Sequence, residues 1–390
     1  MAKDFDSESL CGLEEYGTSS PGIGGVIKKE PEDFRVEERP VDLPEGGDFL
    51  LCRLEKVNLT TYEAVNRIAS NLGISTSRIN YAGLKDKRAS TVQFVTLEGV
   101  EPGRAEFSDG RVQVQPLKKV SRPLKPGDLK GNKFRITIRD IELDREECLE
   151  RLGELKEEIG GGIPNYYGLQ RFGGDRSVTH LVGKRLLLRD FEGAVNTYLT
   201  ETFDSDGAAE ARKRLDEEGD YSAAADYFPG PLRYELKLLE KIKEVDPSDR
   251  EEWIRVFRTF PRNLRRLFVH AYQSYVFNRA LSKLVRQKEE IKNFPGKVPG
   301  YETNLGPSVF DNFLRETLDD DGIELEDFRF DEPKEISSRG TIRPVLISPE
   351  IEAEEISEDP KNQDLNQTVS FFLKPGRYAT VVLREIMKNV

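Results

Sequence analysis

A single aspartate in a turn that opens with glycine is the first candidate for chemistry in this chain. Asp86 lies in AGLKDKRAST (82–91), where Lys85, Lys87 and Arg88 flank it. Neighbouring cations favour the ionised form of a carboxylate. An ionised aspartate on a loop between a helix and a strand can act as a nucleophile or as a general base. The same spacing is also typical of a surface aspartate in a solvated turn, so both interpretations stay open at this point.

A second segment, NYYGLQRFGG (165–174), carries side chains suited to holding a nucleobase. Its amides, Asn165 and Gln170, can read the edge of a base, and its aromatic rings can stack on the face of a base. Arg171 can bind a phosphate. The alternative interpretation is a buried turn whose rings belong to the core. The rings are Tyr166, Tyr167 and Phe172.

Positive charge is concentrated in two stretches, although the chain as a whole is acidic. Lysine plus arginine number 59 and aspartate plus glutamate 71, which gives a net charge of −12. Residues 311–360 alone hold 5 basic and 17 acidic residues, so the rest of the chain is balanced. The basic stretches are 115–139 and RTFPRNLRR (258–266). Such stretches fit the binding of a polyanion on one face, or ordinary solvated loops, and the acidic segment is predicted to be a solvent-facing insertion.

Composition and missing motifs exclude several classes of function. With 390 residues, 37% apolar and 33% charged, the sequence predicts a charge-rich soluble protein of two or three domains. It shows no apolar run of the roughly 18–20 residues that a transmembrane helix needs, and its acidic first twenty residues predict no signal peptide. The patterns GxxxxGK[ST], GxGxxG and HExxH are absent, so hydride transfer, ATP chemistry and zinc hydrolysis lack their usual support.

The cysteines and histidines point the same way. Three cysteines without CxxC spacing predict neither a disulfide framework nor a zinc site, and they favour a reducing, cytoplasmic location. The two histidines, His180 and His270, are far apart in sequence, which disfavours a histidine-rich metal site and a Ser-His-Asp hydrolase. We therefore expect no metal.

The elements that must position the candidate residues form a mixed pattern of strands and helices. A well-marked helix follows Thr60, which forms a capping-box pattern with Glu63, and Gly73 ends it. A further helix is expected over 145–159. The predicted strands of this first part are 26–38, 48–57, 91–97, 111–117 and 133–140.

Helical patterns dominate from about residue 186, and strand texture returns after Arg339-Gly340. The first twenty residues are expected to form a loose arm. The predicted fold class is therefore α+β: one mixed domain, interrupted by a mainly helical insertion, with its last strands supplied by the C-terminus. The domain ranges are 1–185 with 340–390, and 186–339 for the insertion. The predicted C-terminal strands are 341–348, 368–373 and 378–386.

Five blocks of the sequence together resemble the TruD family of tRNA pseudouridine synthases. The blocks are PEDFRVEE, AGLKDKRASTVQ, KGNKFRITIRD, IPNYYGLQRFG and LKPGRYATVVLRE. They occur in the family's order between about residue 24 and residue 390, and the segment FVHAYQSYVFNRALS is similar to the archaeal and eukaryotic branch.

The resemblance implies a pseudouridine-synthase catalytic fold with a helical α+β insertion (TRUD) domain. It implies isomerisation of uridine to pseudouridine in RNA without cofactor or metal, with uridine 13 of the tRNA D arm as the favoured target. Asp86 matches the catalytic aspartate, and Lys28 matches a lysine near it. Asn165 and Tyr167 match the Asn and the aromatic residue of an NYFG motif at the target base, although Tyr167 stands where the family usually has Phe. Apart from the resemblance, the basic stretches and the aromatic segment supply the expected RNA-backbone contacts, which are Lys130, Lys133, Arg171, Arg262, Arg265 and Arg266.

The implied chemistry agrees with the residues. Uridine must lose its N-glycosidic bond, rotate and rejoin through C5, which needs an ionised carboxylate rather than a redox cofactor. Asp86 would attack the sugar or the base, or would remove a sugar proton to give a glycal, and the sequence leaves both routes open. Lys28 would keep Asp86 charged, and Tyr167 would hold the detached base.

Two other classes of function are weighed against an enzyme acting on tRNA. A non-catalytic RNA-binding protein on the same scaffold is disfavoured by the intact GLKD and NYYG segments. A small-molecule lyase that uses the same aspartate is disfavoured by the length of the basic stretches. Within the family, another tRNA or RNA site is the alternative target. The expected partner is tRNA, with no membrane and no small-molecule cofactor, and a monomer is the expected state.

Overall fold

The computed structural model describes residues 4–174, 176–203, 206–246, 249–359 and 364–388. They form two compact units. We call residues 18–163 with 348–388 the sheet unit, and residues 4–17 with 164–347 the helical unit. The units change over near residues 163 and 347, whereas the predicted insertion spans 186–339; that domain division stays a prediction.

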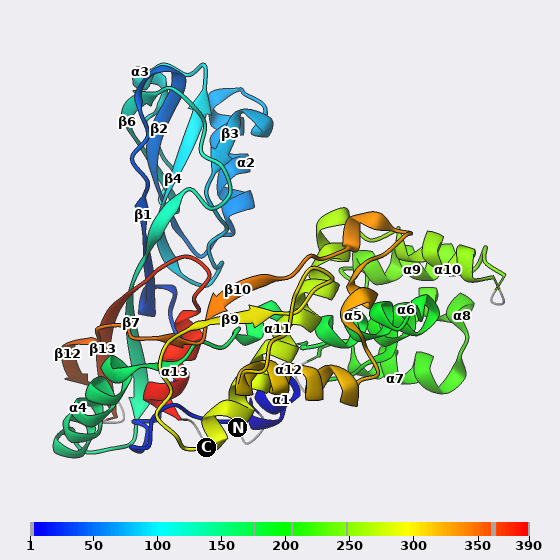
Figure 1. The fold of residues 1–390 in the computed structure, drawn as a ribbon. Helices are drawn as coiled ribbons and strands as arrows, with labels where there is room; N and C mark the ends of the chain where they lie inside the picture. The colour runs from blue at the N-terminus through cyan, green and yellow to red at the C-terminus, as the bar shows by residue number, and fades with distance from the viewer. Residues whose placement is uncertain (1–3, 175, 204–205, 247–248, 360–363, 389–390) are drawn as a thin grey trace. The chain divides into compact units, whose positions relative to one another are not determined.

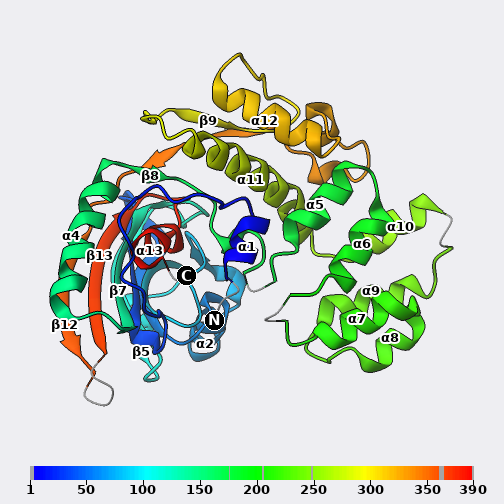
Figure 2. The same cartoon turned by 90° about the horizontal axis from the view of Figure 1, so that it is seen from below.

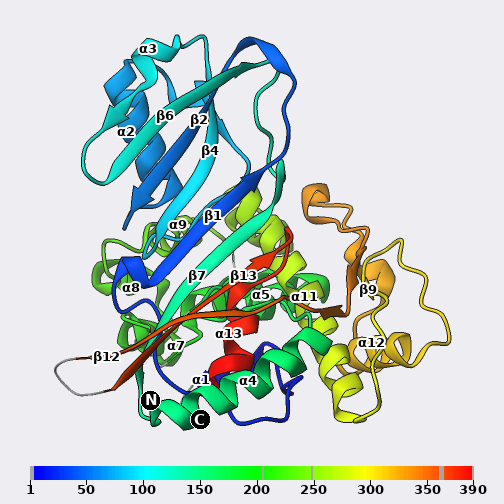
Figure 3. The same ribbon diagram turned by 90° about the vertical axis from the view of Figure 1, so that its left-hand side faces the viewer.

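The sheet unit is built on a sheet of nine strands among the described residues, in the order β12-β13-β7-β1-β4-β2-β6-β5, with β3 paired to β4. Its pairs are antiparallel except β1 with β4, so the sheet is mixed. Figure 3 shows β7, β1, β4, β2 and β6 side by side. The strands are β1 (Phe34–Pro40), β2 (Glu45–Val57), β3 (Ile79–Tyr81), β4 (Ser90–Glu98), β5 (Phe107–Ser108), β6 (Val112–Val120), β7 (Leu129–Ile141), β12 (Glu352–Glu358) and β13 (Leu365–Leu373).

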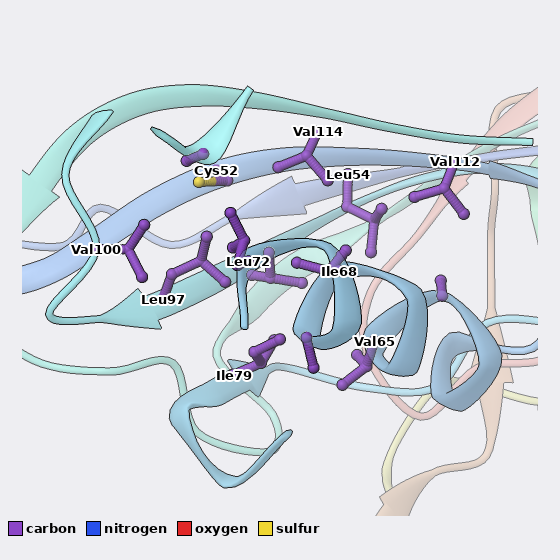
Figure 4. Close-up of a cluster of buried hydrophobic side chains, with 14 of the residues drawn as sticks. Cys52, Leu54, Val65, Ile68, Leu72, Ile79, Leu97, Val100, Val112 and Val114 are labelled. Atoms are coloured by element: carbon purple, nitrogen blue, oxygen red, sulfur yellow. The ribbon is translucent and has the colours of Figure 1, made fainter. Parts of the chain in front are cut away.

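Helix α2 (Thr61–Leu72) covers one face of β2, β4 and β6 (Figure 1) and confirms the capping prediction. The Thr60 side chain accepts from the Glu63 backbone, and Gly73 ends the helix at φ 65°. The apolar stripe of α2 packs onto the inward-facing residues of the strands (Figure 4). Burial of this stripe stabilises the face of the sheet that contains β4, the strand that follows the Asp86 loop.

Parts of the chain differ from the prediction. The strand predicted at 26–38 begins only at Phe34, because Pro31–Asp33 form a short 3₁₀ helix. Residues 378–386 were predicted as a strand, but Ala379–Met387 form helix α13. Strand β13 is already paired by β12 and β7, so the following chain finds no free edge beside it. Val381, Val382 and Ile386 are buried within the sheet unit, and such an apolar run fits a buried helix as well as a strand.

The N-terminal arm is also not loose. Asp4–Leu10 form helix α1, and Cys11 and Leu13 are buried. The Asn278 side chain donates to the Cys11 carbonyl at 3.0 Å, and the Ser282 hydroxyl donates to the Gly12 carbonyl at 2.7 Å. These bonds fix the arm to helix α11 (Arg262–Arg286) within the helical unit.

The helical unit is organised around α11 (Arg262–Arg286), which packs against α5 and α12 (Figure 2). This unit confirms the prediction that helices dominate after residue 186. Strands β9 (Pro295–Val298) and β10 (Thr341–Pro344) form a small antiparallel pair. The other helices are α5 (Thr179–Leu187), α6 (Phe191–Thr200), α7 (Ala209–Glu218), α8 (Tyr221–Tyr227), α9 (Arg233–Ile242), α10 (Arg250–Phe257) and α12 (Val309–Asp320).

In the part of the chain that the structure describes, no helix has both the length and the apolar character needed to cross a membrane. Cys11, Cys52 and Cys148 are buried free thiols.

Candidate active site

The Asp86 loop connects β3 to β4 in the sheet unit, and its backbone is held by side chains from α2 and β4 and by the main chain just before β7. The Lys85 amide donates to the Thr61 hydroxyl at 3.0 Å. The Gln93 side chain donates to the Gly83 carbonyl at 3.3 Å, and the Gly127 amide donates to the Ala82 carbonyl at 2.8 Å. The loop is therefore fixed at several points before any substrate is present.

Lys28 is the partner of the Asp86 carboxylate. Its Nζ lies 2.6 Å from Asp86 Oδ2, and the two side chains are 24% and 46% exposed. The Lys28 ammonium also lies 4.2 Å from the centre of the Phe34 ring, a cation–π contact. Lys28 has φ 58°, a conformation that is rare for lysine and that occurs where the surrounding structure dictates it. This ion pair joins residues 58 positions apart and leaves the Asp86 carboxylate accessible.

The cations beside Asp86 in sequence contact other groups. Lys85 Nζ lies 2.5 Å from Glu38 Oε2, and both side chains are buried. Lys87 pairs with Glu63 at 3.4 Å, and Arg88 donates to the Lys29 carbonyl at 2.8 Å. The basic character of KDKR therefore serves mainly to hold the loop, and Lys28 supplies the charge at the carboxylate.

Lys56 is a residue near Asp86 that the sequence analysis missed. Lys56 lies on β2 and is only 1% exposed. Its ammonium donates to the Asp86 carbonyl at 2.8 Å and to the Leu59 carbonyl at 2.6 Å. Its burial lowers its pKa to about 8. One signal was present in the sequence: Lys56 continues the inward register of Leu50, Cys52 and Leu54.

The NYYG segment lies in the helical unit, where its rings divide into two kinds. Tyr166 and Phe172 are fully buried, and the Tyr166 hydroxyl is 2.9 Å from the Ser282 hydroxyl. These two rings belong to the core, as the alternative interpretation predicted. Tyr167 remains partly exposed, so it is the ring of this segment that best fits contact with a substrate.

Arg343, on β10, joins Asn165 to Tyr167 and was not predicted. Its guanidinium donates to the Asn165 carbonyl at 2.9 Å and to Asn165 Oδ1 at 2.7 Å, and it lies 4.0 Å from the centre of the Tyr167 ring. Asn165 is 1% exposed, and its Nδ2 donates to the Pro344 carbonyl at 2.7 Å. The amide of Asn165 is thus engaged in holding Arg343 and β10.

The Tyr167 backbone is held by a bidentate amide. Asn278 Oδ1 accepts from the Tyr167 amide at 2.8 Å, and Asn278 Nδ2 donates to the Tyr167 carbonyl at 3.0 Å. The ring of Phe277 meets the Tyr167 ring edge-on at 5.6 Å. Two residues of α11 therefore position Tyr167: Asn278 holds its main chain and Phe277 packs against its ring.

The predicted RNA-backbone residues lie in different surroundings. Lys130 pairs with Asp42 at 2.7 Å and Lys133 approaches Glu352 at 3.9 Å, both on the sheet unit. Arg171 donates to the Ser274 hydroxyl at 3.1 Å, and Arg265 pairs with Glu335 and is only 14% exposed. Arg262 and Arg266 are exposed in the first turns of α11.

His270 lies on the same face of α11 as Arg262 and Arg266. Residues 262, 266, 270 and 274 are spaced by four, so they lie on one face of the helix. Burial lowers the pKa of His270 to about 4, and the charges of Arg171 and Arg266 act in the same direction. His270 is therefore neutral at pH 7, and the charge on this face comes from the arginines.

The site residues thus fall into two groups, Lys28 and Asp86 in the sheet unit and Asn165 and Tyr167 in the helical unit. Within the described ranges, no cluster of three or more His, Cys, Asp or Glu side chains is placed to bind a metal ion.

Comparisons with known proteins give one family throughout. The profile described as tRNA pseudouridine synthase D (TruD) matches residues 10–298 and 293–386. A protein of Archaeoglobus fulgidus named "Probable tRNA pseudouridine synthase D" is 36% identical, with 98% of this chain and 99% of the relative covered. A protein of the same name from Methanopyrus kandleri is 40% identical, with 87% of this chain and 86% of the relative covered.

A solved structure agrees in fold. The crystal structure titled as a tRNA pseudouridine synthase D (TruD) from Methanosarcina mazei has a TM-score of 0.83 and 30% identity, and it covers 100% of this chain and 99% of its own. The α+β fold class is confirmed by this likeness and by the mixed sheet. With the profile, the curated relatives and the solved structure in agreement, the chain belongs to the TruD family of tRNA pseudouridine synthases.

Proposed function

We propose that this protein converts a uridine of tRNA to pseudouridine, that Asp86 is the catalytic carboxylate, and that the target is uridine 13 of the D arm. The observation that carries the proposal is the Lys28–Asp86 pair at 2.6 Å on a loop whose backbone is fixed. The 46% exposed Asp86 side chain remains open to a substrate, as a reacting group must be. Family membership supports tRNA as the partner.

The reaction needs no net oxidation or reduction, because substrate and product are isomers. The C1′–N1 bond breaks, a C1′–C5 bond forms, and the C5 proton moves to solvent while N1 gains a proton. Asp86 either attacks the nucleoside covalently or removes a sugar proton to give a glycal. In both routes the carboxylate must be ionised at the start, and water must be kept from the detached base. We propose that the enzyme works without a cofactor, as a monomer and in the cytoplasm.

The direct test is pseudouridine mapping. We expect the purified protein to convert position 13 of an unmodified tRNA transcript, and a transcript with cytidine at position 13 to stay unmodified. Conversion at a different uridine would move the target within tRNA while preserving the chemistry. RNA binding without conversion of any uridine would favour the non-catalytic alternative.

Lys28 is proposed to hold the Asp86 carboxylate charged and correctly turned. A hydrogen bond to a charged group contributes roughly 1.5–3 kcal/mol, and the exposure of this pair places it at the lower end. We therefore expect Lys28→Met to lower the single-turnover rate about tenfold. The tRNA dissociation constant, measured by filter binding, should change little. A Lys28→Met rate equal to wild type would show that the ion pair has no part in the reaction.

The helical unit is proposed to hold the uracil and the RNA backbone. Tyr167 would stack on the base. Arg343, which is held by Asn165, would fix the ring of Tyr167. Arg262 and Arg266 lie near the start of α11, whose first turn contains no acidic residue. Cations are unfavourable at this positive end of a helix dipole, so a bound phosphate would relieve their repulsion.

A salt titration separates the arginines of α11. Removal of one phosphate contact lowers the slope of log affinity against log salt by about 1. We expect the double variant Arg262→Ala, Arg266→Ala to reduce the slope for tRNA by about 1–2. Arg265→Ala should leave the slope unchanged and lower the melting temperature, because Arg265 pairs with Glu335. If the slope changes in Arg265→Ala alone, Arg265 contacts phosphate and Arg262 and Arg266 do not.

A further inference from the structure

The ammonium of Lys56 binds the loop backbone at the residue proposed to do the chemistry. Lys56 Nζ lies 2.8 Å from the Asp86 carbonyl, 2.6 Å from the Leu59 carbonyl and 3.5 Å from the Lys85 carbonyl. An ammonium group has three N–H donors and no acceptor, so it suits three carbonyl oxygens. The side chain crosses from β2 to the loop between β3 and β4, and it is almost fully buried.

A buried ammonium costs free energy, so its presence here calls for a role that an apolar side chain could not fill. A methionine would occupy similar space beside the apolar side chains of β2 without any loss of hydration. What a methionine could not do is donate hydrogen bonds to the carbonyls at positions 85 and 86. We propose that Lys56 is a positioning residue for the reaction: its ammonium fixes the Asp86 backbone so that the carboxylate meets the substrate in a productive geometry. This inference rests on the proposed role of Asp86.

Lys56 and Lys28 restrain Asp86 at opposite ends. Lys28 binds the carboxylate at 2.6 Å, and Lys56 binds the main-chain carbonyl of the same residue at 2.8 Å. Without Lys56, the main chain leading to Asp86 would be held through the bonds at Ala82, Gly83 and Lys85. A shift of about 1 Å at a reacting group can cost on the order of 10²-fold in rate. Two cations on one aspartate thus serve geometry as well as charge.

The same geometry gives a dependence on pH. The charged groups that influence Lys56 are Asp86 and Glu63, which raise its pKa, and Lys85, which lowers it; burial is the largest effect and brings the pKa to about 8. These neighbours are themselves paired, Asp86 with Lys28, Glu63 with Lys87 and Lys85 with Glu38.

The direction of this pH dependence follows from the number of N–H donors on Lys56. Below pH 8 Lys56 carries three N–H groups, one for each carbonyl oxygen. Above pH 8 the neutral amine has two N–H groups, and its lone pair faces an oxygen. The hold on the loop therefore weakens as pH rises, and we expect the single-turnover rate to fall on the alkaline side with a midpoint near pH 8.

The experiment uses the full chain, a tRNA transcript and three variants: Lys56→Met, Lys56→Arg and Arg53→Met. Arg53 is the matched control, since it lies on the same strand and pairs with Glu55 at the surface. We expect Lys56→Met to bind tRNA as the wild type does and to react about tenfold more slowly. Its pH–rate profile should lack the alkaline limb, which is the fall in rate with a midpoint near pH 8. Lys56→Arg, which stays charged, should move that limb upward by at least one pH unit. Arg53→Met should match the wild type in both rate and pH profile.

Hydrogen exchange supplies a readout that does not depend on activity. Amides of residues 84–88 should exchange faster in Lys56→Met, and in the wild type they should lose protection, relative to α4 (Arg145–Gly161) amides, between pH 7 and pH 9. A Lys56→Met rate within threefold of wild type, or a Lys56→Arg limb that coincides with the wild-type limb, overturns the proposal. If Lys56→Met does not fold, the wild-type exchange profile and Lys56→Arg decide. Absence of product from the wild type would instead defeat the proposed function, and loop exchange would still test the restraint.

Discussion

Asp86→Asn is expected to abolish nearly all pseudouridine formation while leaving the fold and tRNA binding intact. Asparagine keeps the shape of the side chain and can still accept a hydrogen bond from Lys28, which lies 2.6 Å from the carboxylate. It can act neither as a nucleophile nor as a base. Loss of a positioned acid–base group costs about 10²–10⁴-fold, and loss of a nucleophile costs at least as much. Single-turnover assays with labelled uridine in tRNA measure this directly.

Two further variants make the Asp86 result specific. Asp86→Glu keeps the charge but moves the carboxylate by about 1 Å, so we expect a loss on the order of 10²-fold. Asp140→Asn is the matched control, because Asp140 also pairs with a lysine, Lys29 at 2.8 Å, on the same unit. It should react as fast as wild type. Near wild-type product from Asp86→Asn would remove the catalytic assignment and most of the mechanism proposed for this protein.

Local signals predicted most of the fold where they were strong. The capping box at Thr60 and the glycine at 73 placed α2 within one residue of its observed bounds. Alternating apolar residues such as Phe134, Ile136 and Ile138 marked β7. The signals failed at α13, because an apolar run buried on most sides does not show whether its period is 2 or 3.6. Strand β13 offers no free edge to the chain that follows it, because it is paired on both sides, and that pairing depends on the whole sheet rather than on the local sequence.

The candidate site was predictable in its residue types and less so in its contacts. The spacing of KDKR indicated cations beside Asp86, but Lys85 binds Glu38, and the carboxylate is served by Lys28 from 58 positions earlier. Lys28 was assigned through resemblance, since nothing local links it to Asp86. Arg343 could not be found, because its contacts to Asn165 depend on how β10 lies against the segment at 165–167. Contacts between distant segments are set by topology and leave no local pattern.

Tyr167→Ala is expected to have the second-largest effect, and Tyr167→Phe a small one. Stacking on a base contributes about 1–3 kcal/mol, and any flat ring can supply it. A phenylalanine would keep the Arg343 guanidinium, 4.0 Å from the ring centre, and the edge-on contact with Phe277. We expect Phe to stay within about threefold of wild type and Ala to lose up to roughly 10²-fold in single-turnover rate. The backbone of residue 167 should keep its place in both variants, because Asn278 holds it through main-chain atoms.

A control and a comparison complete the Tyr167 test. Tyr301→Ala removes another tyrosine of the helical unit that lies under a guanidinium, that of Arg329 at 4.6 Å, and should leave the rate unchanged. If Tyr167→Phe is as slow as Tyr167→Ala, the hydroxyl takes part in proton transfer or hydrogen bonding, and stacking alone does not explain the residue. If Tyr167→Ala reacts at the wild-type rate, the ring does not hold the uracil. In that case Arg343, whose planar guanidinium also offers a stacking surface, becomes the first residue to replace.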